Sequence, residues 1–417
     1  MNNLDKLVIK GKRPLCGEVK VSGAKNAALP LMTISLMINK GFELTNVPNL
    51  LDTKIMKKII NELGVETRSI GDRINFHGLP RTIEVSENLV NKMRASILIL
   101  SPLLQSQKKV RIPLPGGCAI GSRPIDMHID VIKKLGASVN FQNNFLEAFL
   151  PDDNFFGNKL NFKKVSVGAT ECAILAAVLA KGKTILINAA REPEIIDLGT
   201  CLNKAGARIK GLGQSNIIIE GVNQLNPISY SVVSDRIEAG SFAIAAAITK
   251  GNISLKNVET EYLTSFINKL QQSGAKLNIS KNELNVIGAN KIKSVNISTK
   301  PYPGFPTDLQ SPFMSMMCLA DGISTIEENI FENRFQHVPE LEKMGAKITL
   351  SKKKAFITGI DTFEPAKLKA TDLRASMCLI LASLATHGKS EICELEHLSR
   401  GYENLKNKLA NLGADIN

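Results

Sequence analysis

The fold is decided by residues 372–414, which read DLRASMCLILASLATHGKSEICELEHLSRGYENLKNKLANLGA. The part from Ala375 to Ala385 is apolar nearly all round, which predicts a helix buried on every side. Gly388 ends that helix, and a strand is predicted directly after it, over residues 390–395. Residues 400–412 place Leu on one face, which predicts an amphipathic helix followed by a strand. The stretch therefore predicts one unit of buried helix, strand, amphipathic helix and strand.

The same unit recurs along the whole chain. Its marker is a glycine between an apolar or small residue and a small residue, just before a strand. This glycine returns every 68 to 72 residues, as Gly64, Gly136, Gly206, Gly274, Gly345 and Gly413. The predicted buried helices begin near Ala24, Met93, Gly168, Ile237, Leu309 and Leu373. We predict an α/β (α+β) fold of six repeated units of about 70 residues each.

The sixth unit has only one strand after its amphipathic helix, whereas the other units have two. Residues 7–10, followed by Gly11, have the character of a strand that belongs to no unit of their own. We expect this N-terminal strand to complete the sixth unit. The chain then divides into two domains of three units, 21–232 and 1–20 with 233–417, and a cleft between two similar domains is a natural ligand site.

Most of the residues that could bind a ligand or take part in catalysis lie just before the predicted buried helices. They are Lys25, Asn26, Arg94, Lys164, Val165, Ser166, Val167, Asp308, Asp372 and Arg374. If three buried helices pack side by side, their N-termini converge, and their dipoles add to the cations in attracting anions. Asp308 would stay ionised among such cations and could act as a base. Taken singly, each residue is more often a solvated charge or a cap, and only the repeated position favours function.

A loop in the second unit, residues 113–126, reads PLPGGCAIGSRPID. Its Gly and Pro residues exclude a central helix or strand. Cys118 and Arg123 lie on it, next to a predicted helix N-terminus, where a thiol can become acidic. A buried structural cysteine is the alternative. Arg334 and Arg400 precede the amphipathic helices of the fifth and sixth units as Arg123 does in the second, which suggests bidentate binding of phosphate or carboxylate.

The composition limits the classes of partner. The net charge is +13, but Lys and Arg are spread along the chain, and there is no Trp. Small anionic substrates are therefore favoured over nucleic acid. The seven Cys and five His show no metal-ligand spacing, which predicts a reduced cytoplasmic protein without structural zinc. No apolar segment is long enough to span a bilayer, so no membrane insertion is expected.

The remaining argument is a resemblance. The motifs that carry it are SGAKN at 22–26, MRAS at 93–96, LPGGCAIGSRPID at 114–126, KVSVGAT at 164–170, AREPEI at 190–195, FPTD at 305–308, FENRF at 331–335, HVPEL at 337–341, TDLRAS at 371–376 and RGY at 400–402. Together, in order and over essentially the whole chain, they resemble the UDP-N-acetylglucosamine 1-carboxyvinyltransferases. The resemblance implies two inside-out α/β barrel domains of three units each, with helices inside and sheets outside.

The resemblance also implies a reaction. The enolpyruvyl group of phosphoenolpyruvate would pass to the 3′-hydroxyl of UDP-N-acetylglucosamine, with release of phosphate, as the first committed step of bacterial peptidoglycan synthesis. Asp308 would take the hydroxyl proton, and Cys118 would protonate C3 and can form a covalent adduct with phosphoenolpyruvate. No metal or organic cofactor is implied. The expected partners are these two small molecules, and the expected state is a monomer.

The resemblance assigns ligands as well. Lys25, Asn26, Arg123 and Arg400 would hold phosphate and carboxylate. The nucleotide sugar would contact Arg94, Arg123, Pro124, Ile125, Asp126, Met127, Lys164, Val165, Ser166, Val167, Asp308 and Ile330, and Arg334, Asp372 and Arg374 complete the expected site.

The chain departs from the family's motifs at one position, and three alternative functions stay open. The family usually has Asp before Arg-Gly-Tyr, where this chain has Ser399, so the orientation of Arg400 is in question. A catalytically inactive nucleotide-sugar-binding regulatory paralogue would keep the same fold. The sister enzyme, 5-enolpyruvylshikimate-3-phosphate synthase, lacks the Pro-Gly-Gly-Cys loop, and a nucleic-acid-binding repeat protein would need a basic face.

Overall fold

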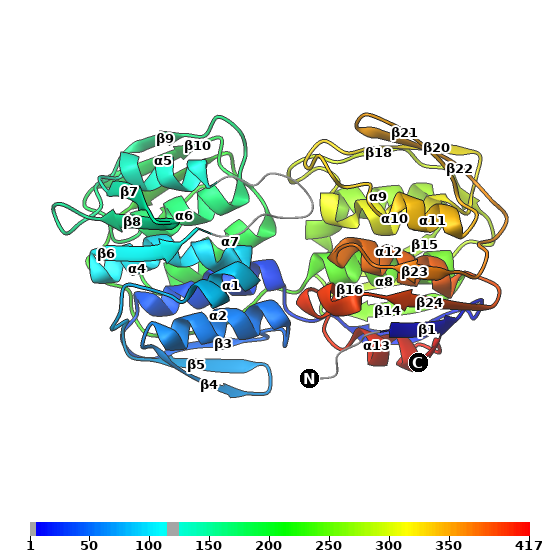
Figure 1. Cartoon of the computed structure of the whole chain (residues 1–417), viewed down its shortest axis with the longest axis horizontal. Coiled ribbons are helices and arrows are strands. Elements are labelled where there is room, and N and C mark those ends of the chain that lie inside the picture. Colours follow the sequence, from blue (N-terminus) through cyan, green and yellow to red (C-terminus); the bar gives the residue numbers. More distant parts are fainter. Residues whose placement is uncertain (1–5, 115–124) are drawn as a thin grey trace. The chain divides into compact units, whose positions relative to one another are not determined.

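The structure is a computed structural model and describes residues 6–114 and 125–417. The chain forms two compact units (Figure 1). The first-half unit contains the described residues from 23 to 233, and the second-half unit contains residues 6–22 and 234–417. The boundaries expected from the repeat lay after residues 20 and 232. Within each unit the sheets lie outside and helices lie inside, so the predicted α/β fold class is confirmed.

The first-half unit holds three sheets. Its helices are α1 (Lys25–Thr33), α2 (Leu51–Glu62), α3 (Glu87–Lys92), α4 (Leu100–Gln107), α5 (Asp126–Lys134), α6 (Val167–Ala177) and α7 (Pro193–Lys204). Its strands are β3 (Phe42–Thr45), β4 (Glu66–Ile70), β5 (Arg73–His77), β6 (Lys109–Pro113), β7 (Ser138–Gln142), β8 (Phe145–Phe149), β9 (Lys159–Asn161), β10 (Lys183–Ile187), β11 (Arg208–Lys210), β12 (Asn216–Glu220) and β13 (Ile228–Ser231). The strand orders are β13-β3-β5-β4, β6-β8-β7 and β11-β12-β10-β9, one sheet for each repeat.

The second-half unit follows the same plan. Its helices are α8 (Arg236–Ile248), α9 (Thr264–Gln272), α10 (Gln310–Met317), α11 (Val338–Lys343), α12 (Leu373–Leu384) and α13 (Leu405–Asn411). Its strands are β1 (Lys6–Lys10), β2 (Cys16–Lys20), β14 (Asn252–Lys256), β15 (Lys276–Ser280), β16 (Glu283–Ile287), β17 (Ile292–Lys293), β18 (Ile297–Ser298), β19 (Ala320–Asp321), β20 (Ile323–Glu327), β21 (Lys347–Ser351), β22 (Lys354–Thr358), β23 (Lys367–Lys369), β24 (Lys389–Cys393) and β25 (Asp415–Ile416). The larger sheets are ordered β15-β16-β14-β2, β18-β20-β22-β21 and β23-β24-β1-β25.

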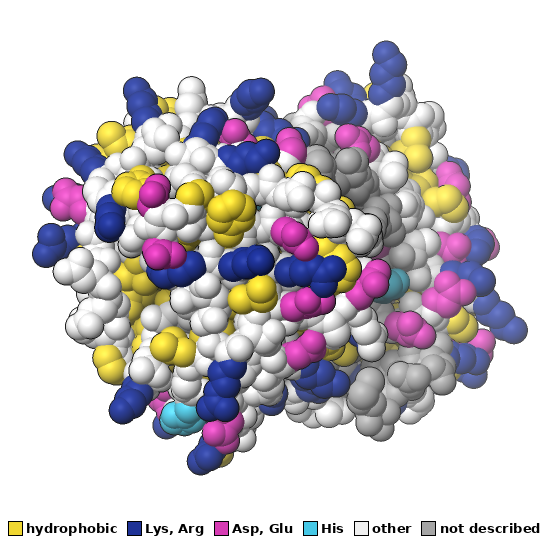
Figure 2. All heavy atoms as spheres, turned by 60° about the vertical axis from the view of Figure 1, so that its left-hand side comes forward, with side chains coloured by type: hydrophobic (Ala, Val, Ile, Leu, Met, Phe, Trp, Pro, Cys, Tyr) yellow, Lys and Arg dark blue, Asp and Glu magenta, His cyan; other side chains and the backbone are white. Residues whose placement is uncertain are grey.

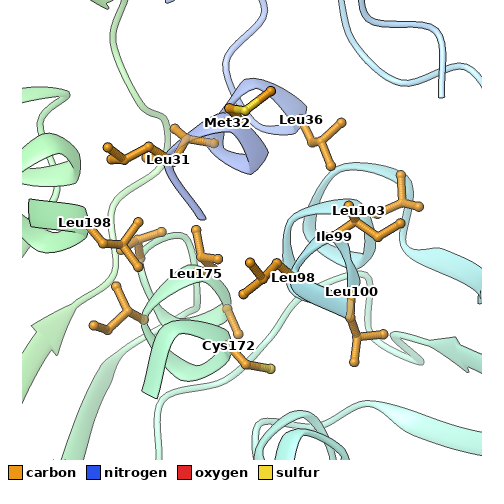
Figure 3. Close-up of a cluster of buried hydrophobic side chains, with 14 of the residues drawn as sticks. Leu31, Met32, Leu36, Leu98, Ile99, Leu100, Leu103, Cys172, Leu175 and Leu198 are labelled. Atoms are coloured by element: carbon orange, nitrogen blue, oxygen red, sulfur yellow. The ribbon is translucent and has the colours of Figure 1, made fainter. Parts of the chain in front are cut away.

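The predicted buried helices form the core of each unit. In the second-half unit α8, α10 and α12 pack against one another, and α8 is buried from Ile237 to its end. In the first-half unit α4 and α6 are in contact, and Figure 3 shows Leu98 and Leu175 facing one another at the centre of the cluster. A helix that is apolar all round is stable only in such a position, because no face of it can be left to water.

The second α-helix of the core, α4, starts later than the predicted Met93, whereas the fifth, α10, starts next to the predicted Leu309, and a 3-10 segment precedes each of them. These segments are η2 (Arg94–Ile99) and η4 (Thr307–Leu309). The α-helices that follow, α4 and α10, contain Pro102 and Pro312 in their first turns. Proline lacks the N–H that would bond to the carbonyl four residues earlier, which removes one α-helical hydrogen bond across the junction with each 3-10 segment.

The N-terminal strand completes the sixth unit, as predicted. β1 is antiparallel to β24, with Leu7 opposite Ile392, and also pairs with β25. The predicted amphipathic helix from residue 400 is wrong at its start. Residues 395–400 form a 3-10 helix, η5, and α13 begins only at Leu405, because Asn404 has a left-handed backbone (φ 49°) that interrupts helical geometry.

Candidate active site

Asp308 is held by two arginines of the second-half unit. Arg374 donates from Nη2 to Oδ2 of Asp308 at 2.7 Å, and Arg334 donates from Nη2 to Oδ1. The side chains of Arg334 and Arg374 are 5% and 7% exposed, whereas that of Asp308 is 24% exposed. The carboxylate is thus the solvent-facing member of a buried charged cluster, and the guanidinium groups favour its ionised form. The prediction that Asp308 lies among cations is confirmed.

The N-termini of the three buried helices converge at this cluster. Asp308 lies in η4, before α10, and Arg374 lies in the first turn of α12. Asp235 caps α8, and Asp372 caps α12 by accepting the backbone N–H groups of residues 374 and 375. Burial lowers the pKa of Arg374, but attraction by Asp308, Tyr402 and Asp235 outweighs burial and raises it. The guanidinium therefore stays charged at every accessible pH.

Behind Asp308, a buried glutamate ties two loops together. Glu328 accepts a hydrogen bond from Thr307 Oγ1 at 2.8 Å and another from the backbone N–H of Ile330 at 2.8 Å. It also accepts from Thr299 Oγ1 at 2.9 Å. Nothing in the sequence distinguishes Glu328 from its neighbour Glu327, which points to the exposed side of β20 and bonds Ser298. Only the tertiary structure identifies the glutamate that supports Asp308.

In the first-half unit, Lys25 is paired with a carboxylate. Its Nζ lies 3.2 Å from Oδ2 of Asp52, which is in the first turn of α2 and is nearly buried. The carboxylate fixes the ammonium group at the first residue of α1, where the helix dipole and the lysine charge both attract anions. Lys25 was predicted from its place before a buried helix, whereas Asp52 was not, although it is an acidic residue at a helix start.

Arg94 and the start of α6, which were predicted to belong to the site, lie near His128, which was not. His128, in the first turn of α5, packs its ring against Gly168 at the start of α6. Burial, together with the charge of Arg94, lowers the pKa of His128 to about 4, so the imidazole is neutral near pH 7. Ser166 caps α6 by accepting from the N–H of Ala169 at 3.3 Å. The prediction that helix starts converge therefore holds here for Arg94 and the α6 N-terminus.

The other predicted residues are placed as follows. Ile125, Met127, Val165 and Val167 are half-buried, whereas Asn26, Asp126 and Lys164 are exposed. Arg400 is half-buried at the end of η5, and the neighbouring Ser399 donates its hydroxyl to the backbone carbonyl of Glu396 at 3.0 Å. Cys118, Arg123 and Pro124 lie outside the described residues.

The surface charge is mixed. On the face in Figure 2, Lys and Arg side chains alternate with Asp and Glu instead of forming a basic stripe. In the part of the chain that the structure describes, no cluster of three or more His, Cys, Asp or Glu side chains has metal-binding geometry. Across residues 6–114 and 125–417, every helix is too short or too polar to cross a bilayer.

Comparison with known proteins identifies the family. The family model described as EPSP synthase (3-phosphoshikimate 1-carboxyvinyltransferase) matches residues 9–409. A protein of Geotalea uraniireducens (strain Rf4) named UDP-N-acetylglucosamine 1-carboxyvinyltransferase is 48% identical over 415 residues, which cover 99% of both chains. The chain belongs to the EPSP synthase family, among the UDP-N-acetylglucosamine 1-carboxyvinyltransferases. A protein of Rickettsia prowazekii (strain Madrid E) with the same name is 46% identical, again over 99% of both chains.

Solved structures of the EPSP synthase family agree with the fold. The enolpyruvyl transferase NikO from Streptomyces tendae superposes with a TM-score of 0.90 at 22% identity, over 99% of this chain and 98% of that chain. EPSP synthase from Acinetobacter baumannii gives a TM-score of 0.77 at 19% identity, over 99% of both chains. The two-domain fold predicted for a UDP-N-acetylglucosamine 1-carboxyvinyltransferase is thereby confirmed.

Proposed function

We propose that this protein transfers the enolpyruvyl group of phosphoenolpyruvate to the 3′-hydroxyl of UDP-N-acetylglucosamine and releases phosphate. The observation that carries the proposal is the full-length identity of 48% with a relative of that name. The reaction is the first committed step of peptidoglycan synthesis, and its place in the cell is the cytoplasm.

The chemistry begins at Asp308. Its ionised carboxylate accepts the proton of the 3′-hydroxyl as the sugar oxygen attacks C2 of the enolpyruvate, and Cys118 delivers a proton to C3. The tetrahedral adduct then loses phosphate, which takes up the proton held by Asp308, and the thiolate of Cys118 takes back a proton from C3, which restores the double bond and the thiol. Support for the base comes from the position of Asp308, which is partly exposed and contacts two guanidinium groups.

The cations have two tasks in this proposal. Lys25, Arg123 and Arg400, with Asn26 beside them, bind the phosphate and carboxylate of phosphoenolpyruvate. Negative charge develops on the leaving phosphate, and preorganised cations stabilise it. The Lys25–Asp52 pair supports this assignment, because it holds the ammonium group in place before the substrate binds.

The nucleotide sugar is assigned to the other positions. It contacts Arg94, residues 123–127, residues 164–167 and Ile330, while Asp308 is shared by both substrates. The α6 N-terminus capped by Ser166 supports binding of an anionic group of the nucleotide. Arg334, Arg374 and Asp372 act at the same place through Asp308. The two units are the two domains of the transferase, the second-half one supplying the base, and the reaction uses no metal or organic cofactor.

The test is release of phosphate from phosphoenolpyruvate, with UDP-N-acetylglucosamine or shikimate 3-phosphate as acceptor. We expect release with the nucleotide sugar alone, and loss of release in Cys118→Ala and Asp308→Ala. Full activity in both variants would overturn the assigned roles. Release with neither acceptor, from folded protein that binds the nucleotide sugar, would support the inactive regulatory paralogue instead.

A further inference from the structure

Arg374 has a second anchor, on the side away from Asp308. Its Nη1 lies 3.3 Å from the hydroxyl oxygen of Tyr402, and that oxygen lies 2.8 Å from Oγ of Ser241 in α8. Oγ of Ser241 in turn donates to the carbonyl of Ile237 at 2.8 Å. Tyr402 and Ser241 are both buried, and neither was selected by the sequence analysis as a site residue.

The direction of each hydrogen bond between Arg374, Tyr402, Ser241 and the carbonyl of Ile237 is fixed. A guanidinium can only donate, so the oxygen of Tyr402 accepts from Arg374. The single hydroxyl proton of Ser241 is used by the carbonyl of Ile237, so Tyr402 must donate its own proton to Ser241. Burial raises the pKa of Tyr402 despite the opposing charge of Arg374, so the hydroxyl remains protonated near pH 7. A series of hydrogen bonds with defined direction thus connects the backbone of α8 to the guanidinium.

This series of hydrogen bonds ends at the carboxylate. Arg374 uses Nη1 for Tyr402 and Nη2 for Oδ2 of Asp308, so the position of one nitrogen fixes the other in the planar guanidinium. Arg334 donates to the other oxygen, Oδ1. A guanidinium nitrogen on each oxygen restricts rotation of the carboxylate about its Cβ–Cγ bond and defines its plane.

We propose that Tyr402 and Ser241 are positioning residues for the base, because they lock Arg374 in the orientation that holds Oδ2 of Asp308. The inference rests on the proposed function, since it assigns a task within that active site. Neither residue touches substrate. They act through Arg374, and their contribution lies in the rate of the chemical step.

The charged surroundings of Asp308 set the pH dependence. Arg334 and Arg374 contact it directly, and Asp372 and Asp235 act on these arginines from α12 and α8. Glu328 reaches it only through Thr307, and His337 of α11, with a pKa lowered to about 4 by burial, stays neutral. Loosening Arg374 therefore weakens one of the two guanidinium contacts that stabilise the ionised carboxylate, and the acid limb of the rate profile moves to higher pH.

The experiment compares Tyr402→Phe with the full-length wild type in phosphate release at varied pH. We expect kcat to fall about 10- to 100-fold, as for loss of a hydrogen bond to a charged group that aligns a reacting residue. KM for both substrates should change by less than about threefold, because the lost interaction acts in the transition state. The acid limb of kcat should move up by roughly half a unit to one unit.

The matched control is Tyr230→Phe. Tyr230 is also buried, and its hydroxyl donates to Asp197 at 2.7 Å, but it belongs to the first-half unit. We expect wild-type kcat and an unmoved acid limb in this variant. Ser241→Ala keeps Tyr402 but removes its acceptor, so it should show the same changes at smaller size, and it carries the test if Tyr402→Phe does not fold.

The outcomes separate the two claims. If the wild type releases no phosphate with UDP-N-acetylglucosamine, the proposed function fails and the inference fails with it. If the wild type is active but Tyr402→Phe and Ser241→Ala keep its kcat and acid limb, only the inference fails. An equal loss in Tyr230→Phe would also overturn it, as a general effect of removing a buried hydroxyl. A crystal structure of Tyr402→Phe in which Arg374 keeps its position against Asp308 would also overturn the inference, and this test needs no activity measurement.

Discussion

Lys408→Met removes the cation that lies against a buried glutamate, and we expect a loss of stability that grows as the pH rises. Nζ of Lys408 lies 2.6 Å from Oε1 of Glu238 and 2.7 Å from Oγ of Ser22. The other carboxylate oxygen of Glu238 accepts from the backbone N–H of Ser22 at 2.7 Å. Ser22 is the last residue of the second-half unit before the chain passes into the first-half unit. The pair therefore anchors the connecting segment three residues before Lys25.

The magnitude follows from the burial of Glu238, whose side chain is 2% exposed. Removing one partner of a buried ion pair costs about 3–5 kcal/mol when the remaining charge stays. Glu238 can escape that cost by taking a proton. Protonation of a carboxyl with an ordinary pKa costs about 1.4 kcal/mol per pH unit, hence roughly 5 kcal/mol at pH 8 and roughly 1.5 kcal/mol at pH 5.5. Glu238 adopts whichever state costs less free energy, the buried charged form or the protonated form. The expected loss is therefore about 4 kcal/mol at pH 8 and about 1.5 kcal/mol at pH 5.5.

The sign agrees with the titration of Glu238. Burial raises its pKa, against the opposing effect of Lys408 and of the hydrogen bond from Ser22. A carboxyl with a raised pKa in the folded state destabilises the fold progressively as the pH rises above its unfolded value. Without Lys408 the pKa rises further, so the penalty extends to higher pH.

The assay is urea unfolding followed by circular dichroism at pH 5.5 and 8. Glu238→Gln in the Lys408→Met background should restore part of the stability at pH 8, because no buried charge remains. Lys291→Met is the control, since Lys291 pairs with Asp321 at 2.7 Å on the open surface, and it should leave the midpoint unchanged. A loss that is equal at both pH values, or no recovery in the double variant, would refute the reasoning.

Three further outcomes are expected. Asp308→Asn should lower kcat about 10²- to 10⁴-fold in the phosphate-release assay while the protein stays folded, and a smaller loss would exclude general-base catalysis by Asp308. Burial lowers the pKa of His337 to about 4, so the unfolded chain binds a proton that the folded one does not, and stability is lost as the pH falls from 6.5 to 4. Because His128 titrates in the same range, the share of His337 is the part of the loss, about 3 kcal/mol, that disappears from urea unfolding in His337→Gln, and an unchanged pH slope in that variant would contradict the prediction. Phe313→Ala, in α10, should lower the free energy of unfolding by about 3–5 kcal/mol, whereas Phe356→Ala on the surface of β22 should cost less than about 1 kcal/mol.

The repeat could be predicted because its signals are local. An apolar helix, a glycine that ends a helix and an alternating strand each depend on residues near one another in the chain. Comparison of the six copies also predicted that the N-terminal strand, β1, joins the sheet of the sixth unit that contains β24. The sixth unit lacked one strand in sequence, and the N-terminal strand belonged to no other unit. The 3-10 segments at Arg94 and Thr307 could not be predicted from Pro102 and Pro312 alone, because Pro30 lies inside α1 without such a segment before it. The late start of α13 could not be predicted either, because nothing before Asn404 marks a backbone of positive φ.

The partners of the site residues could not be predicted. Lys25 was selected by its position, but its pairing with Asp52 depends on how α1 packs against α2. Arg374 and Asp308 are separated by a long stretch of chain, and only the contact of α10 with α12 brings them within 2.7 Å. Tyr402 stood in a recognised motif without a role, because the role comes from Ser241 on a third helix. Position along the helix was enough to select these residues as candidates, and packing determines what each one touches.

The burial of these residues divides the helix-start positions into two kinds. Arg334 and Arg374 were expected to grip phosphate or carboxylate from a ligand, yet each gives a guanidinium nitrogen to Asp308. The side chains of Arg334 and Arg374 are 5% and 7% exposed and both are bound to the same carboxylate, so a second anion could bind them only if these contacts were broken. Their charge is better used to keep Asp308 ionised and oriented, which a base requires. Lys25 differs, because its ammonium group has three N–H donors and is paired with a carboxylate of its own, Asp52. Direct contact with an anionic substrate is then left to the more exposed cations at the helix starts, such as Lys164. We therefore predict that a cation at a helix start binds substrate where its side chain reaches solvent and acts on Asp308 where it does not.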